Sequence, residues 1–91
     1  MSRVFEFDPE KSAANLAKHG IDFEMAQALW LDPSAAKIPA LSAREDRFGV
    51  VGCIDGQPWT AFATMRDEIV RIISVRRSRQ SEVRFYDTQK D

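Results

Sequence analysis

The sequence predicts a single α+β domain, in which two N-terminal helices and a short C-terminal helix pack with an antiparallel sheet of three to five strands. Three observations predict this class. Apolar residues recur at helical spacing from Pro9 to Leu31, the period shortens to strand alternation between Ala36 and Arg76, and helical spacing returns after Ser78. A chain of 91 residues holds one hydrophobic core, so residues 1–91 are expected to form one domain.

The first helix is predicted from the residues at its two ends. A short run of strand formers, Val4 to Phe7, leads into Asp8, which can cap a helix, and Pro9, which suits the first helical position. Gly20 suits the left-handed conformation that follows many helix ends. A strand and a helix of about three turns are therefore expected here.

The second helix and the first strands of the sheet follow. Asp22 can cap a helix over Phe23 to Leu31, which Asp32-Pro33 should end because the residue before proline avoids the helical conformation. A weak strand is expected at Ala36 to Leu41, and a clear apolar strand at Phe48 to Ile54. The two helices should then form a hairpin beside the sheet.

The remaining strands are connected by tight turns. Asp55-Gly56 is a two-residue hairpin signal that leads into a strand at Trp59 to Thr64. A second turn at Arg66 to Glu68 leads into Ile69 to Arg76. Ser78 is expected to cap the last short helix.

The overall composition excludes several classes of protein. The net charge is −1, and 44% of the residues are hydrophobic, as in an ordinary soluble domain. No apolar run is long enough to span a membrane and no signal peptide is visible, so a cytoplasmic protein without a membrane association is expected. The single cysteine, Cys53, permits neither an internal disulfide nor a cysteine cluster for zinc.

The charges are divided unevenly along the chain. Residues 1–46 carry 5 basic and 8 acidic side chains, whereas residues 47–91 carry 8 basic and 6 acidic ones. The segment from Arg71 to Arg84 contains five arginines and one acid, Glu82. The weak net charge argues against a domain that binds DNA through many phosphates, and a small local phosphate site remains possible.

Three segments, read together, are similar to the BrnT family of bacterial toxins. The first is the pattern Phe5-x-Phe-Asp-Pro-x-Lys-x-x-x-Asn-x-x-Lys-His-Gly-Ile-x-Phe23. The second is Glu45-Asp46-Arg47 with Phe48 and Gly52, and the third runs from Arg71 to Arg79 and continues to Glu82 and Tyr86. The resemblance covers about Val4 to Asp87.

The resemblance implies a RelE-like fold and cleavage of RNA without a metal or other cofactor, by a ribonuclease toxin that inhibits translation. It also implies a BrnA-like ribbon-helix-helix antitoxin. The two proteins would form a hetero-oligomer that binds operator DNA through the antitoxin and represses its own operon.

Arginine suits one step of that chemistry, because its planar fork holds two phosphate oxygens and stays charged. Arg76 and Arg77 stand at the end of the last strand and ahead of the last helix, where backbone N–H groups also attract an anion, and Arg79 lies in the first turn of that helix. Strand alternation places Arg71 and Arg77 on one face and Arg76 on the other, so that one arginine serves RNA while its neighbour pairs with Glu45 or Asp46. Alternatively, these arginines are surface residues that keep the sheet edge soluble.

Other candidate residues have a structural interpretation beside the functional one. His19 is the sole histidine, and histidine is the residue type suited to acid or base catalysis at neutral pH, but a cation at a helix end is also favoured by the helix dipole. Lys11 and Lys18 share a helix face that could bind RNA or face solvent, and Arg71 could join them. Arg47 could enter the catalytic cleft or pair with Glu45.

Two functions from different classes fit these residues. The first is a ribonuclease toxin with catalytic residues Arg76, Arg77, Arg79, His19 and Arg47, and RNA-binding residues Lys11, Lys18 and Arg71. The second is a catalytically degenerate binding module that acts only through its antitoxin partner in operon repression. The sequence assigns no general base and states no RNA sequence preference.

Overall fold

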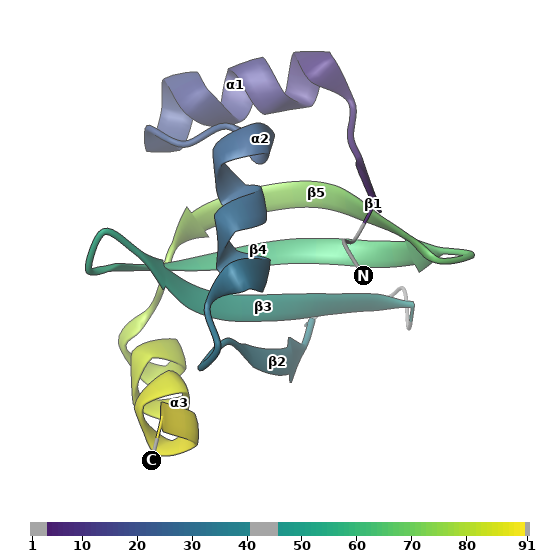
Figure 1. The fold of residues 1–91 in the computed structure, drawn as a ribbon. Helices are drawn as coiled ribbons and strands as arrows, with labels where there is room; N and C mark the ends of the chain where they lie inside the picture. The colour runs from purple at the N-terminus through teal and green to yellow at the C-terminus, as the bar shows by residue number, and fades with distance from the viewer. Residues whose placement is uncertain (1–3, 41–45, 91) are drawn as a thin grey trace.

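A computed structural model describes residues 4–40 and 46–90 of the protein (Figure 1). The elements follow the predicted order of strand, two helices, strands and helix. They are β1 (Val4–Glu6), α1 (Pro9–His19), α2 (Phe23–Ala26), the 3-10 helix η1 (Gln27–Leu31), β2 (Ala36–Pro39), β3 (Arg47–Ile54), β4 (Gln57–Arg66), β5 (Ile69–Arg77) and α3 (Gln80–Lys90).

The sheet has five strands in the order β1-β5-β4-β3-β2 among the described residues. Strands β2 to β5 are antiparallel neighbours, as predicted, whereas β1 runs parallel to β5 at the other edge. The parallel pair arises because α1 and α2 lie between β1 and the rest of the sheet in the sequence and return the chain to the opposite edge. The fold is α+β with a mixed sheet.

Local chemistry forms the elements as expected. The Asp8 side chain accepts from the Glu10 N–H at 2.9 Å, and that of Asp22 accepts from the Met25 N–H at 2.7 Å, so both helix starts are capped. Gly20 ends α1 with φ 82°. Asp55 and Gly56 both have positive φ, 51° and 79°, as the two-residue turn between β3 and β4 requires.

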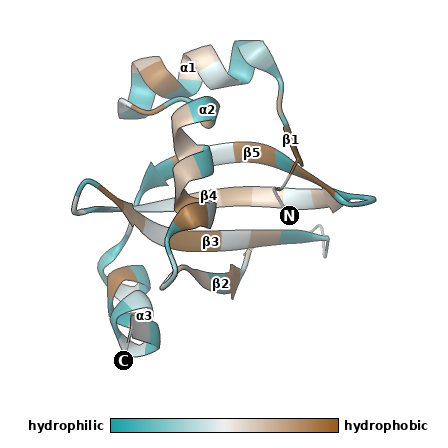
Figure 2. Cartoon of the chain, viewed as in Figure 1, coloured by the Kyte–Doolittle hydropathy of each residue, from teal (hydrophilic) through white to brown (hydrophobic). Residues whose placement is uncertain are grey.

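The hydrophobic core lies between the helices and one face of the sheet. Phe23, Ala26 and Leu29 project from α2 and η1 onto buried strand residues such as Ile72 and Val75. Figure 2 shows strongly hydrophobic stretches in β3 and β5, and hydrophilic residues over much of α1 and in the turn between β4 and β5. We call this side of the sheet the helix face.

The opposite side, which we call the open face, is covered only at one end among the described residues. There α3 packs against β2 and β3, and its Tyr86 is 5% exposed. The Tyr86 hydroxyl donates to the Asp32 carboxylate at 2.6 Å, and the same carboxylate oxygen accepts from the Cys53 N–H. Asp32 therefore ends η1 and also ties α3 to the body of the protein.

The alternation predicted for β5 is wrong because the strand contains a β-bulge. Phe62 pairs with Ser74 and Ala63 pairs with Ile72, so Ile73 has no partner in the register. The alternation of side chains therefore shifts by one residue at Ile73. As a result, Arg71 lies on the open face together with Arg76, while Arg77 lies on the helix face. The prediction that Arg76 and Arg77 point apart is confirmed.

Three boundaries also differ from the prediction. The second helix is α-helical only to Ala26 and then tightens into η1. Ser78 does not cap α3; its N–H donates to the Pro58 carbonyl and its hydroxyl contacts that of Thr60, while Arg79 is the residue that precedes the helix. The weak strand expected to reach Leu41 ends at Pro39, and Leu41 itself lies outside the described residues.

Candidate active site

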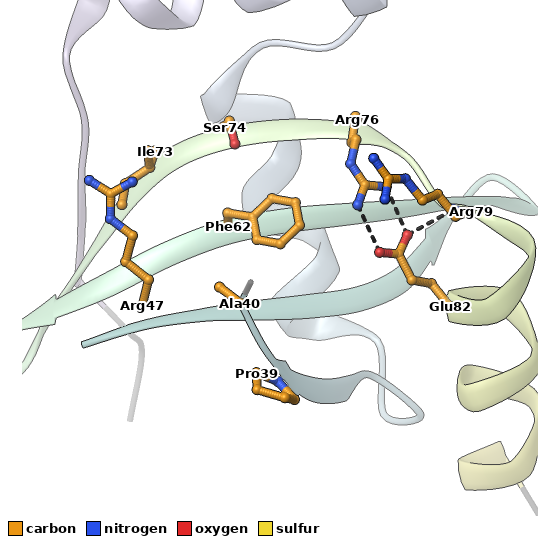
Figure 3. Close-up of a pocket in the computed structure, with 9 residues that line it drawn as sticks. All are labelled: Pro39, Ala40, Arg47, Phe62, Ile73, Ser74, Arg76, Arg79 and Glu82. Carbon is orange, nitrogen blue, oxygen red and sulfur yellow. Dashed lines mark hydrogen bonds and ion pairs between the residues drawn. The ribbon is translucent and has the colours of Figure 1, made fainter. Parts of the chain in front are cut away.

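A cavity of about 410 Å³ opens on the open face of the sheet, beside the N-terminus of α3. Three of the predicted arginines line it: Arg47 from the start of β3, and Arg76 and Arg79 from the junction between β5 and α3. Figure 3 shows Arg47 on one side of the cavity and Arg76 and Arg79 on the other. The remaining lining residues are Pro39, Ala40, Phe62, Ile73, Ser74 and Glu82.

Arg76 is held in place by a bidentate ion pair with Glu82. Its Nη1 and Nη2 donate to the two oxygens of the Glu82 carboxylate, each at 2.8 Å, and Nη1 also donates to the Arg77 carbonyl at 3.2 Å. The two side chains are 24% and 12% exposed, so the pair is largely desolvated. A two-point contact of this kind fixes the plane of the guanidinium group.

Glu82 accepts two further hydrogen bonds, both on Oε1, the carboxylate oxygen that also accepts from Nη1 of Arg76. The Arg79 N–H donates to it at 2.7 Å and the Thr60 hydroxyl at 2.9 Å. Burial by itself raises the pKa of the Glu82 carboxyl, but the donors from Arg76, Arg79 and Thr60 outweigh this effect and lower the pKa to about 2. Glu82 is therefore ionised at neutral pH and is a poor proton acceptor, which suits it to hold Arg76 rather than to act as a base.

Arg47 and Arg79 have a different environment from Arg76. No carboxylate within residues 4–40 and 46–90 forms an ion pair with either guanidinium group. The acid proposed as a partner for Arg47, Glu45, lies outside the described residues. Within the described part of the chain, two of the three cavity arginines thus keep their donors available for an anion.

A second cavity, of about 460 Å³, continues the open face toward the N-terminus of α1. It shares Arg47 and Ile73 with the first cavity and is also lined by Lys11 and Arg71. The Arg71 side chain donates to Glu6 at 2.7 Å, and Arg66 contacts the same carboxylate at 3.4 Å. The other lining residues are Asp8, Asp46, Thr64, Arg66 and Ile72.

The two cavities together carry more positive than negative side chains, six cations against three carboxylates, although the whole chain has a net charge of −1. The fold therefore gathers on one face the positive charge that the sequence distributes between Lys11 and Arg79. An electropositive concave surface of this kind attracts a polyanion.

Three predicted site residues lie away from these cavities. Arg77 projects from the helix face and stands over the Trp59 ring, 5.3 Å from its centroid. Lys18 and His19 end α1, about 12 Å along the helix axis from Lys11, which lines the second cavity. The structure thus brings together Arg47, Arg76 and Arg79, adds Lys11 and Arg71 beside them, and leaves the other three outside.

The Asn15 side chain explains how α1 fixes the end of β5. Its Nδ2 donates to the carbonyls of Ile21 and Val75, at 2.8 and 2.9 Å, and its Oδ1 accepts from the Val75 N–H at 3.2 Å. Asn15 is 9% exposed, so these bonds satisfy buried backbone groups. Because Val75 precedes Arg76, this buried amide positions the strand segment from which Arg76 projects.

Two residues of the first cavity, Glu82 and Phe62, contact Arg76 but received no role in the sequence analysis. Glu82 had a recognisable signal, since it follows Arg79 by three residues at the start of a helix, the spacing at which an acidic side chain accepts from a backbone N–H. Phe62 had a weaker signal, as the large apolar residue that alternates with Thr60 and Thr64 on β4. Neither signal distinguishes a functional residue from an ordinary cap or core residue.

Two further features are absent from residues 4–40 and 46–90. Within them, no three side chains of His, Cys, Asp or Glu are grouped so that they could hold a metal ion. None of the helices in the same ranges is both long and apolar enough to cross a membrane.

Comparison with known proteins identifies the family. No curated protein sequence matches the chain. A family model does match, over residues 7–82, and it describes the ribonuclease toxin BrnT of a type II toxin–antitoxin system. The match spans α1, every strand from β2 to β5 and the start of α3, including the cavity arginines. The chain belongs to the BrnT family of ribonuclease toxins, whose members act with an antitoxin partner.

Proposed function

We propose that the protein cleaves RNA at the arginine-lined cavity without a metal ion, that Arg76 and Arg79 bind the scissile phosphate, and that Arg47 binds a neighbouring phosphate of the same strand. The observation that carries this proposal is that three arginines, one from β3 and two from the junction of β5 and α3, line one cavity. Lys11 and Arg71, beside the second cavity, would bind the RNA backbone on one side of that phosphate.

The chemistry follows from what RNA cleavage requires. The 2′-hydroxyl loses its proton to water as its oxygen attacks the adjacent phosphorus, the bond from phosphorus to the 5′-oxygen breaks, and the leaving 5′-oxygen takes a proton from water, so that a 2′,3′-cyclic phosphate and a 5′-hydroxyl are formed. Negative charge builds on the phosphoryl oxygens during this step, and groups that meet this charge lower the barrier. Arginines supply that stabilisation without a metal, because they stay protonated at any cellular pH. The ion pair with Glu82 holds Arg76 in one orientation in advance, so less reorganisation is needed when the charge develops.

The biological setting of the proposal follows the family. Cleavage of RNA in the cytoplasm would inhibit translation, and a BrnA-like ribbon-helix-helix antitoxin would neutralise the toxin. The resulting hetero-oligomer would bind operator DNA through the antitoxin.

The test uses variants that break no ion pair among residues 4–40 and 46–90. We expect Arg79→Ala to lower the rate of RNA cleavage by the purified protein about 100-fold, the scale found when one donor to a transition-state anion is removed. Arg47→Ala should lower the rate less, because Arg47 binds a neighbouring phosphate. Arg84→Ala, an exposed arginine on α3 away from the lining residues, is the matched control and should retain full activity. Activity is measured on a labelled transcript in the presence of excess chelator.

A second experiment follows growth after induction of the chain in a bacterial host. Wild type and Arg84→Ala should arrest growth and degrade a reporter transcript, whereas Arg76→Ala should do neither. Because Arg76→Ala leaves Glu82 unpaired, its folding and antitoxin binding are checked in parallel. A soluble wild type that neither arrests growth nor cleaves RNA would instead identify a binding module that acts only through its antitoxin.

A further inference from the structure

The two cavities leave an aromatic residue between two groups of cations. The ring of Phe62 lines the first cavity at the centre of the open face, between Arg47 and Arg76 (Figure 3). Phe62 is partly buried, and α3 reaches the neighbouring open-face position on β4, where the Thr60 hydroxyl donates to Glu82. An aromatic ring on a cationic face is the combination by which proteins hold single-stranded nucleic acid.

The strand register gives the spacing of the two cation groups. Arg76 pairs with Thr60 on β4, whereas Arg47 and Arg71 both pair with Thr64, four residues further along the same strand. Four residues of a strand span about 13 Å, and Phe62 lies at the midpoint. Stacked nucleotides advance by about 3.4 Å each, so this distance covers more than one nucleotide of a single strand.

The neighbours of Phe62 fix its ring in this position. Opposite Phe62 on β3 stands Gly49, and a Cβ added to Gly49 would lie 3.3 Å from the Phe62 ring and 2.8 Å from the Ile38 side chain. The missing side chain at Gly49 thus leaves room for the ring to lie against β3. On the other side, the Arg76 guanidinium stands 5.1 Å from the ring centroid.

We propose that Phe62 is a stacking platform for one nucleobase of the RNA, with phosphates of the same strand bound by Arg76 and Arg79 on one side and by Arg47, Arg71 and Lys11 on the other. The inference rests on the proposed ribonuclease function and deepens it. It assigns a nucleobase-binding site to Phe62, which lies outside the arginine cluster. It also orients the RNA strand parallel to the axis of β4.

The test measures binding separately from cleavage. Short oligoribonucleotides with 2′-O-methyl groups have no free 2′-hydroxyl and cannot be cleaved by its attack, so their affinity is read directly by fluorescence anisotropy. We expect Phe62→Leu to weaken binding about tenfold and Phe62→Trp to preserve it, since stacking needs an aromatic face. Phe48→Leu, the same change on the helix face of β3, is the matched control and should leave the affinity unchanged.

An abasic scan then identifies the stacked base. One internal abasic nucleotide should weaken binding to the wild type but not to Phe62→Leu, because the variant has already lost the interaction. The thermal stability of each variant is measured alongside, so that an unfolded variant is recognised. If Phe62→Leu is unfolded, the affinity of Phe62→Trp decides whether an aromatic ring at this position supports binding.

The outcomes separate this inference from the proposed function. Equal binding by Phe62→Leu and wild type, with no position sensitive to base removal, would overturn the platform even if the wild type cleaves RNA. Aromatic-dependent binding by a wild type that never cleaves RNA would support the platform and overturn the ribonuclease proposal. Absence of any binding by the folded wild type would also overturn the platform.

Discussion

Replacing Glu82 with glutamine should destabilise the protein strongly at neutral pH and hardly at acidic pH. The Glu82 side chain is 12% exposed and accepts four hydrogen bonds, two of them from Arg76. A glutamine of the same shape has one acceptor oxygen, and its amide N–H groups would face the donors of Arg76. The buried guanidinium would then lose its compensating charge.

The lowered pKa of Glu82 sets the magnitude. The difference between the usual value of 4.5 and about 2 corresponds to about 3 kcal/mol of folding free energy at neutral pH. Because the pKa of the folded state is the lower one, this stabilisation is complete above the unfolded-state pKa. It is lost as the pH falls through the range from about 4.5 to about 2.

Denaturant unfolding at a series of pH values measures this effect. We expect the wild type to exceed Glu82→Gln by about 3 kcal/mol at neutral pH, and the difference to shrink steadily toward acidic pH. For a domain of this size, Glu82→Gln should lower the melting temperature at neutral pH by at least about 10 °C. Glu68→Gln, an exposed acid in the turn between β4 and β5, is the matched control and should show neither effect.

A difference between wild type and Glu82→Gln that stays constant with pH would refute this reasoning. It would mean that the side chain acts through its shape and neutral hydrogen bonds, and that the charge of the carboxylate contributes little.

Two further changes test how the site is supported. Asn15→Ala should lower the free energy of unfolding by about 3 kcal/mol, because it leaves buried backbone groups of Val75 and Ile21 unsatisfied. Denaturant unfolding measures this loss, with Lys18→Ala on the exposed side of the same helix as the control. A loss equal to that of Lys18→Ala would contradict the prediction. Gly49→Ala should cost about 1–3 kcal/mol and also weaken RNA binding by displacing the Phe62 ring. Gly52→Ala, which meets Leu29 on the helix face at 3.2 Å, should destabilise comparably without changing RNA affinity, and equal affinities for the two variants would argue against a role for the ring.

Much of the fold could be predicted because its signals are local. The caps at Asp8 and Asp22, the left-handed Gly20 and the turn at Asp55-Gly56 each depend on residues within one turn of the chain. Such signals locate the ends of helices and hairpins without knowledge of the rest of the molecule. The parallel pairing of β1 has no comparable local signal, because it depends on where two helices return the chain.

The arrangement of the site was less predictable for the same reason. A β-bulge at Ile73 depends on how β4 and β5 pair, and a strict period of two therefore placed Arg71 on the wrong face relative to Arg76. The partner of Arg76 was sought among acids before β3, whereas the fold supplies Glu82 from the helix that follows. Sequence spacing identified the arginines but not their neighbours.

The bulge also has a consequence for how the site tolerates mutation over evolutionary time. Ile73 has no partner on β4, so its removal would restore strict alternation and leave Arg76 paired with Thr60 and Arg77 paired with Trp59. Both arginines would then keep their present faces, and the Arg76 guanidinium would still point into the cavity. The bulge thus allows β5 to lose one residue without inverting the strand segment that carries the site.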